Sequence, residues 1–397
     1  MINAENGYGA DINAKDKYGM TSLHHCAIRG NHRVLQKLLR TPGIIKEPRD
    51  MQDSTPLHLA CTYNQLAIAQ ILINEDANIR ALDSDLRTPL HEACQEGNKE
   101  IAHLLLKKAD ELGIVRQMTS DKDDDGATPL LLGVGKGGTD IVKLLLEYQA
   151  NPNKANKEHN FPVHSAARTG DWDTLKLLLE HNAEVDCTNN MSETPLFLAA
   201  ENNNGEVIEF LLENGADINQ YNINVVTPIM AAAIEGHADV VELLMSKDAN
   251  IDLCDKDDRS LLSHAVEENK VSVVEILLNS SSGSGLELLE VCDQYDNLPI
   301  HVAATEGHLE IFRLLFQHGP HLIERKNEDE MTPMHLAAIN GRVDIVEEIL
   351  QSKRNAIMNE DEDSNTPLHL ACMNKKARTA AVLLWVVDNL VLNHLRF

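Results

Sequence analysis

The sequence predicts an all-α solenoid of about eleven helix–turn–helix units with projecting fingers. A short phrase returns along the chain, most fully as Thr-Pro-Leu-His at Thr55–His58, Thr88–His91 and Thr366–His369. Its successive first residues lie 33 or 34 positions apart, except for two intervals of 40 and 38. A fixed period of this length marks stacked copies of one supersecondary unit rather than one globular core. The repeats, numbered 1 to 11, begin at Thr21, Thr55, Thr88, Thr128, Phe161, Thr194, Thr227, Ser260, Leu298, Thr332 and Thr366.

The repeating unit is clearest in repeat 3. Thr88 stands where a helix N-cap belongs, and Pro89 takes the first helical position, where a missing N–H costs nothing. Apolar residues then follow at the spacing of one helix face, namely Leu90, Ala93 and Cys94 in a first helix and Ile101, Leu104 and Leu105 in a second. Polar stretches rich in Gly, Asn and Asp, such as 214–219, lie between successive helix pairs and predict turns at the tips of fingers.

The repeats divide the chain into three predicted parts. We expect residues 1–20 to be the tail of a preceding, incomplete repeat, residues 21–384 to form the solenoid, and residues 385–397 to be an off-pattern tail. The two long intervals predict insertions at finger positions, an acidic one near 111–125 and a Ser/Gly-rich one near 280–285. Both ends look unfinished, so we expect a fragment of a longer protein or a truncated gene model. The alternative is that 385–397 folds down as a cap.

Composition narrows the classes of function. The net charge of −27 argues against nucleic-acid binding, which needs a basic stripe, and against binding to an anionic membrane surface. No apolar run approaches the ~20 residues that span a bilayer, so we expect no membrane insertion by this chain. Seven scattered cysteines fit a reducing compartment rather than a disulfide framework. We expect Cys26, Cys61, Cys94 and Cys372 to be buried, and Cys187, Cys254 and Cys292, in fingers, to be more exposed.

Three motifs suggest specific chemistry, and each has a structural interpretation that we favour. Seven histidines recur in the phrase, and beside a helix start each ring is expected to hydrogen-bond the adjoining unit rather than a metal. Asp121–Gly126 opens like a calcium loop, but Leu132 stands where that loop needs a bidentate Glu. Gly133–Gly138 fits Gly-x-Gly-x-x-Gly, but it fills a helix–turn of repeat 4 rather than a strand–helix junction. We therefore predict no metal and no cofactor.

The sequence also predicts that the chain is not an enzyme. No nucleophile, base and orienting group occur together at a position outside the repeat, and repetition argues against a unique catalytic site. No catalytic residue is assigned.

The phrase, together with Glu235–His237, Glu306–His308 and Asn214–Asn219, closely resembles the consensus of the ankyrin-repeat family. This resemblance extends over nearly the whole chain. It implies a stack that binds protein partners on a concave face built from finger tips and from outward positions of the first helices. Carried onto this sequence, the candidate partner-binding residues are Asp83, Asp85, Glu92, Gln95, Arg168, Asn189, Asn222, Glu235, Lys256, Tyr295 and Glu328.

Two short stretches point to one branch of that family. Gly113–Met118 followed by Gly126–Pro129, and the Phe161–Ala167 variant of the phrase, resemble the amino-terminal ankyrin region of TRPA-type cation channels. This resemblance implies a cytoplasmic region at the cytosolic face of the plasma membrane, attached to a calcium-permeable, stimulus-gated pore that assembles as a homotetramer. The alternatives are a soluble ankyrin adaptor or scaffold without channel activity, and an enzyme-linked ankyrin protein. The ligand, the stimulus, the oligomeric state and the role of the two insertions do not follow from the sequence.

Overall fold

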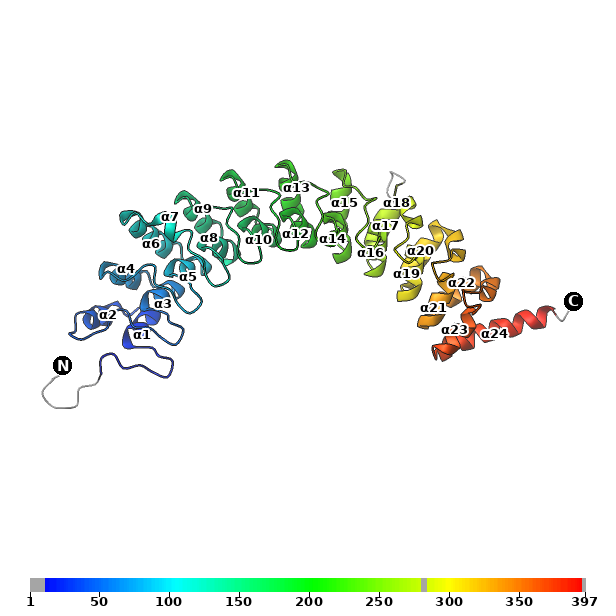
Figure 1. Ribbon diagram of the computed structural model, residues 1–397, viewed down its shortest axis with the longest axis horizontal. Helices are drawn as coiled ribbons and strands as arrows, with labels where there is room; N and C mark the ends of the chain where they lie inside the picture. Colours follow the sequence, from blue (N-terminus) through cyan, green and yellow to red (C-terminus); the bar gives the residue numbers. More distant parts are fainter. Residues whose placement is uncertain (1–10, 280–283, 395–397) are drawn as a thin grey trace. The chain divides into compact units, whose positions relative to one another are not determined.

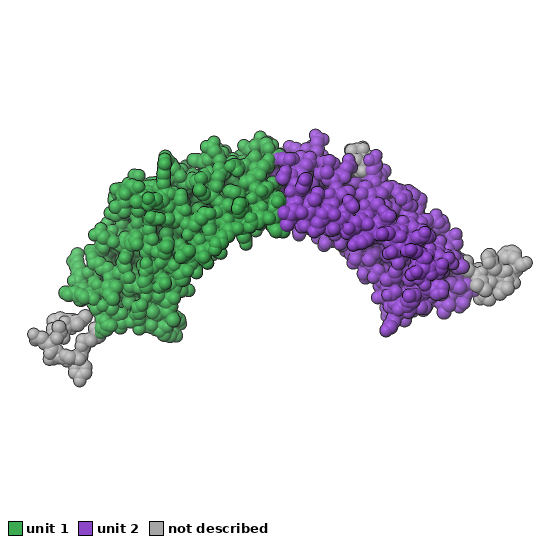
Figure 2. Space-filling model, viewed as in Figure 1, with its two compact units in different colours: residues 1–195, 209–216 green, residues 196–208, 217–397 purple. Residues whose placement is uncertain are grey.

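The computed structural model describes residues 11–279 and 284–394, in which helices are joined by turns and finger loops (Figure 1). These residues form no β-strand; one isolated bridge pairs Cys254 with Ser260 across the base of a finger. The predicted all-α class is confirmed. The chain divides into two compact units, residues 1–195 with 209–216 and residues 196–208 with 217–397 (Figure 2).

Each repeat contributes a first and a second helix. The first helices are α1 (Ser22–Arg29), α3 (Pro56–Thr62), α5 (Pro89–Gln95), α8 (Pro129–Leu132), α10 (Pro162–Thr169), α12 (Pro195–Glu201), α14 (Pro228–Glu235), α16 (Leu261–Glu267), α19 (Pro299–Glu306), α21 (Pro333–Asn340) and α23 (Pro367–Met373). The second helices are α2 (His32–Leu39), α4 (Leu66–Asn74), α6 (Lys99–Glu111), α9 (Thr139–Glu147), α11 (Trp172–Glu180), α13 (Gly205–Glu213), α15 (Ala238–Ser246), α17 (Val271–Asn279), α20 (Leu309–His318), α22 (Val343–Ser352) and α24 (Ala377–His394).

Local sequence sets where the first helices begin. Thr88 has the extended backbone of an N-cap (φ −91°, ψ 164°), and Pro89 is the first helical residue. In Ser260, which replaces the usual Thr, the hydroxyl accepts the Ser263 N–H at 3.2 Å. Each first helix is thus started by residues of the repeated phrase itself, which explains why the phrase keeps its phase along the chain.

Within each compact unit the helices form two rows. In the first unit α1, α3, α5 and α8 pack in succession, as do α2, α4, α6 and α9 (Figure 1). In the second unit α14, α16, α19, α21 and α23 form one row, and α15, α17, α20, α22 and α24 form the other. Leu90, Ile101 and Leu105 are fully buried between the rows, as predicted, whereas Leu104 is only half-buried.

The predicted insertions contain helical structure. Near 111–125 the second helix of repeat 3 extends to Glu111, and a short helix α7 (Val115–Met118) follows with Met118 fully buried. Of the second insertion, residues 280–283 lie outside the described residues, and α18 (Ser284–Glu287) and a 3₁₀ turn η2 (Leu288–Glu290) follow. Two further 3₁₀ turns, η3 (Pro320–Glu324) and η4 (Arg354–Met358), follow α20 and α22.

The predicted terminal parts fall only partly within the described chain. Residues 1–10 and 395–397 lie outside the described residues. Helix α24 runs without a break across the boundary expected at 384/385, so that boundary stays a prediction. No helix within 11–279 and 284–394 is both long enough and apolar enough to cross a membrane.

Candidate partner-binding face

The finger tips are shaped by one recurring side chain. An Asp or Asn near the start of each finger accepts the backbone N–H of the residue two or four positions later, as Asp293 Oδ1 does from Tyr295 and Asn297 at 2.9 and 2.8 Å. Such local acceptors are the chemistry of tight turns. The residues in this role are Asp16, Asp50, Asp83, Asp123, Asn156, Asn189, Asn222, Asp255, Asp293, Asn327 and Asp361.

Backbone hydrogen bonds also join one finger to the next. Lys157 N–H donates to the Asp125 carbonyl at 2.9 Å, and Glu328 N–H donates to the Tyr295 carbonyl at 3.1 Å. A similar bond joins Ser84 N–H to the Gln52 carbonyl at 2.9 Å. The tips are therefore held in register, and their exposed side chains are presented from an ordered backbone.

In each compact unit, we call the surface formed by the finger tips and by the outward positions of the first helices the finger–helix face. Six of the predicted partner-binding residues are exposed on it: Asp85, Arg168, Glu235, Lys256, Tyr295 and Glu328. Tyr295 leaves 57% of its surface exposed. The assignment of these residues to partner binding stays a prediction.

The other predicted residues are drawn inward. Asn222 is buried and its amide oxygen holds its own finger, so the structure removes it from the exposed candidates. Asp83 and Asn189 have the same turn-forming role and are half-buried. Glu92 accepts the Thr62 hydroxyl at 2.8 Å, and burial raises the pKa of its carboxyl above the ordinary value.

Several exposed apolar side chains at the fingers were not predicted. The most exposed is Met51, at 75%, and Tyr18, Leu86, Met191 and Ile223 are also exposed. Large contiguous apolar patches mark interaction sites, whereas single exposed apolar residues are common on protein surfaces. Their signal in the sequence is an apolar residue at a turn position, within three places of the turn-forming Asp or Asn, where polar residues are expected.

A hollow of about 410 Å³ opens on this face in the first compact unit. It lies between the first helices of repeats 3, 4 and 5 and the fingers that directly precede these helices. Gln95 and Arg168, both predicted, line it together with Arg87, Asp123, Asp125, Lys136, Asn160 and His164. In repeat 4 the first helix does not continue regularly, because α8 passes into a π-helical turn η1 (Gly133–Gly137).

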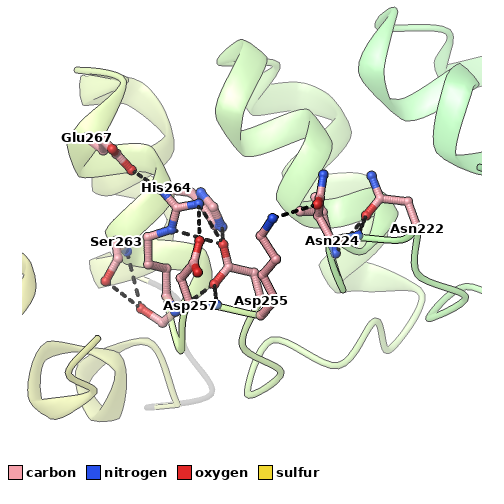
Figure 3. Close-up of polar contacts among 11 residues, drawn as sticks. Asn222, Asn224, Asp255, Asp257, Ser263, His264 and Glu267 are labelled. Carbon is pink, nitrogen blue, oxygen red and sulfur yellow. Dashed lines mark hydrogen bonds and ion pairs between the residues drawn. The ribbon is translucent and has the colours of Figure 1, made fainter. Parts of the chain in front are cut away.

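Repeat 8 carries a second unusual cluster, shown in Figure 3. Buried Asp255 pairs with Arg259 at 2.9 Å, and Arg259 also reaches Glu267 at 2.9 Å. His264 Nε2 lies 3.2 Å from Asp255 Oδ2, although the approach is not aligned as a hydrogen bond. Burial raises the pKa of Asp255, but the backbone N–H donors and the side chains of His264 and Arg259 outweigh this effect, so the pKa is lower than the ordinary value. The cluster ties the finger that precedes Ser260 to the first helix of repeat 8.

The histidines of the phrase join neighbouring repeats. Nδ1 of His24 accepts the Thr21 N–H at 3.0 Å, and Nε2 donates at 3.0 Å to the carbonyl of Ser54, the residue directly before the N-cap of repeat 2. Equivalent bonds are made by His58, His91, His164, His301 and His335. Between residues 11 and 279 and between 284 and 394, no three His, Cys, Asp or Glu side chains are grouped as metal ligands would be.

Two cysteine predictions are wrong. Cys187 is buried although it lies in a finger segment, because its thiol packs 3.8 Å from the His164 ring, and burial raises its pKa to about 12. Cys372 is exposed although it occupies a helix position that is buried in repeats 2 and 3. Cys254 and Cys292 are half-buried, with pKa values raised by partial burial and by nearby Asp residues.

Comparison with known proteins identifies the family. The model "Ankyrin repeats (3 copies)" matches residues 2–83, 23–115, 75–156, 140–222, 229–326 and 300–389. The chain belongs to the ankyrin-repeat family. Ankyrin repeats are protein-interaction modules, so the chain is an ankyrin-repeat protein-interaction domain.

Several curated proteins are similar over part of the chain. Delta-latroinsectotoxin-Lt1a of Latrodectus tredecimguttatus is 38% identical over 77 residues, 19% of this chain and 6% of the toxin. Transient receptor potential cation channel subfamily A member 1 of Homo sapiens is 27% identical over 170 residues, 43% of this chain and 15% of the channel. Nuclear factor NF-kappa-B p105 subunit of Gallus gallus is 27% identical over 169 residues, 41% of this chain and 16% of that protein. This chain spans less than a fifth of the length of each relative.

Proposed function

We propose that this chain binds protein partners through its finger–helix face and is the cytoplasmic ankyrin region of a TRPA-like, calcium-permeable cation channel that detects sensory stimuli. In this proposal the chain itself has no enzymatic activity and lies at the cytosolic face of the plasma membrane, where a channel pore would assemble it as a homotetramer. The similarity to the human subfamily A channel over 43% of the chain supports the channel assignment.

The alternative is an ankyrin adaptor or scaffold without channel activity. The similarity to NF-kappa-B p105 subunit over a comparable share of the chain, 41%, favours it. Sequencing the complete transcript separates the two. Six apolar segments of about 20 residues after this region would support the channel. A stop codon directly after Phe397 in a full-length transcript would rule the channel out and favour the adaptor.

One structural observation carries the partner-binding part: exposed side chains such as Tyr295 stand on fingers whose backbones are locked to one another. Asp85→Lys, Tyr295→Ala and Glu328→Lys together alter this face without removing a turn-forming acceptor. The matched control, Leu112→Ala with Glu275→Lys and Glu310→Lys, alters exposed residues that lie elsewhere, at or next to second helices.

The test compares the proteins that wild type, triple variant and control retain from an extract, quantified by mass spectrometry. We expect the triple variant to lose most specifically retained proteins and the control to keep them. Equal retention by all three would show that partners do not use this face.

A further inference from the structure

Repeat 4 is the least regular repeat on the finger–helix face. Leu131 stands at the position of the histidine that joins neighbouring repeats, here called the stapling histidine. Glycines occupy positions 133, 135 and 137. Gly133–Gly137 forms a π-helical turn, a feature that often accompanies functional sites. A Cβ added at Gly135 would meet nothing within 4 Å, whereas a Cβ at Gly133 would lie 2.9 Å from Ile141 Cγ2. Gly133 thus lets helices pack closely, and Gly135 leaves space open.

The open space arises because Gly135 occupies a position that carries a long side chain in both neighbours. Counting seven residues from the start of each repeat gives Gln95 in repeat 3, Gly135 in repeat 4 and Arg168 in repeat 5. The hollow of about 410 Å³ is lined by all three. Its volume falls in the range of about 300–1,000 Å³ typical of ligand sites.

The charge at this point of the face is exceptional. The residues seven and eight places after the start of the eleven repeats include six glutamates and three basic residues. One basic residue, Arg29, lies in repeat 1, and the other two, Lys136 and Arg168, lie in the adjacent repeats 4 and 5. Both cations line the hollow. In a chain of net charge −27, this is a local positive site.

The buried carboxylate in the hollow, Asp123, is already paired with Arg87. Buried Asp123 lies 3.6 Å from Arg87 Nε, and its Oδ1 accepts the Ala127 N–H at 2.7 Å. Arg87 also lies 3.7 Å from Glu92. Lys136, by contrast, is exposed and makes no ion pair or hydrogen bond with the described residues. Asp125 is the other carboxylate at the hollow, and it is exposed on the finger.

The uncharged lining adds hydrogen-bonding capacity. Gln95 Oε1 and Arg87 Nε have no hydrogen-bond partner among the described residues. Burial lowers the pKa of His164 to about 4, so this ring is neutral at pH 7 and adds no positive charge. An acceptor in the Gln95 side chain suits a backbone N–H of an incoming segment, and the Lys136 ammonium suits a carboxylate.

We propose that this hollow receives an Asp or Glu side chain from a partner segment lying along the finger–helix face, with Lys136 as its principal charge partner and Arg168 as the second cation. The inference rests on the proposed partner-binding function and names the chemistry of the partner. The binding is electrostatic and open to water, so it weakens as ionic strength rises.

The test uses a degenerate library of peptides about twelve residues long, passed over the immobilised chain, with the retained residues identified by mass spectrometry. We expect Asp and Glu to be enriched over the input by about threefold, as charge complementarity at one site requires. The strongest retained peptide is then resynthesised, and its affinity is measured by fluorescence anisotropy. We expect Lys136→Glu to weaken its binding at least about tenfold.

Two further variants make the result specific. Gly135→Gln restores the side chain found in repeat 3 and leaves the charge unchanged, so it should weaken binding by filling the hollow. Lys143→Glu removes the same charge from the exposed surface of α9 and should leave the affinity unchanged. Circular dichroism of each variant confirms that the helices are intact.

The outcomes distinguish a failure of the acidic-partner inference from a failure of the proposed partner-binding function. If peptides are retained but Asp and Glu are not enriched, or if Lys136→Glu and Lys143→Glu behave alike, the acidic-partner inference is wrong and peptide binding stands. If no peptide is retained above the bare support, the proposed partner-binding function and the inference both fail.

Discussion

At the scale of single residues, the stapling histidines work only as neutral rings. In His301 the Nδ1 atom accepts the Leu298 N–H at 3.1 Å, and Nε2 faces the Arg325 carbonyl at 3.0 Å. One nitrogen must therefore be unprotonated while the other donates. Burial lowers the pKa of His164 and His301 to about 4 each. These residues favour the folded state above pH 6.5 and oppose it in acid.

This gives a pH dependence with a defined sign. The unfolded histidine titrates near 6.5 and the folded one near 4, so the unfolded state binds more protons between these values. We expect the stabilisation to be complete above pH 6.5 and to fall as the pH drops toward 4, with a loss of about 2 kcal/mol for each of these two histidines at pH 5.

Hydrogen exchange at pH 7 and pH 5, corrected for intrinsic rates, measures this loss locally. Amides of α10 and α19 should lose protection, whereas those of α8 in repeat 4, where Leu131 replaces the histidine, provide the internal control. A uniform change across all three helices would refute the histidine explanation.

The turn-forming side chain of each finger gives a second prediction. Asp293→Ala removes the acceptor of two backbone N–H groups, and we expect a local loss of about 1–3 kcal/mol. Asp293→Asn keeps the acceptor, as Asn does in the fingers directly before repeats 5, 6, 7 and 10, and should be nearly neutral. Urea midpoints of the two variants check this. Equal destabilisation by Ala and Asn would show that charge, rather than the hydrogen bonds, matters.

Single positions also show what the sequence does not reveal. The spacing placed Asn222 at a finger tip, but it could not show that its amide folds inward onto Asn224 and Val226. Cys187 and Cys372 fail for a similar reason, since their burial depends on neighbouring repeats rather than on their own positions. The exposure of a given residue depends on tertiary contacts. The local sequence predicts only which apolar positions of the repeat are buried.

At the scale of elements, the helices were predictable and their irregularities were not. Thr and Pro at the start of each first helix specify that helix on local grounds. The local sequence does not predict the π-helical turn at Gly133–Gly137, because glycine adopts several backbone conformations. Close packing of Ile141 against Gly133 accompanies the unusual turn. The hollow beside Gly135 was therefore missed, although two of its lining residues, Gln95 and Arg168, were among the candidates.

Core packing within a helix pair gives a prediction at this scale. Leu105 of α6 is fully buried, and Leu105→Ala should cost about 2–5 kcal/mol through lost contacts and a residual cavity. Because each repeat contacts only its neighbours, protection should fall in repeats 2 to 4 and stay unchanged in repeats 9 to 11. Hydrogen exchange measures both regions.

The control for Leu105 is Leu112, which leaves 54% of its surface exposed just after the same helix. Leu112→Ala should change stability by no more than about 0.5 kcal/mol. A loss of protection in Leu105→Ala that extends evenly to repeats 9 to 11 would mean that the stack responds as one cooperative core.

At the scale of the whole molecule, the periodicity of the sequence predicts the fold. The candidate site lies where the sequence departs from that periodicity. The period alone predicted the number of repeats, the all-α class and the position of both insertions. It predicted the charge chemistry of the finger–helix face less well, because outward positions vary without affecting packing. Lys136 was present in the sequence, but its significance depends on the neighbouring glutamates and on the hollow beside it.

The same modular construction predicts unfolding without a single transition. The chain has two tryptophans, and Trp385 is 68% exposed, so a Trp385→Phe variant leaves Trp172 as the reporter of repeat 5. Trp172 packs edge-on against Phe210, with ring centroids 5.3 Å apart. Repeats 4 and 6, on either side, carry Leu131 and Phe197 at the position where repeats 1, 2, 3, 5, 9, 10 and 11 carry a histidine.

We therefore expect the fluorescence of Trp172 to change at a lower guanidinium concentration than the helical circular dichroism, which averages over all repeats. Both signals are recorded on the same sample at equilibrium, and His335→Leu, which removes a staple far along the chain in repeat 10, serves as a control that should leave the Trp172 midpoint in place. Two curves that superimpose within error would establish two-state unfolding, and stability would then belong to the whole stack rather than to its repeats.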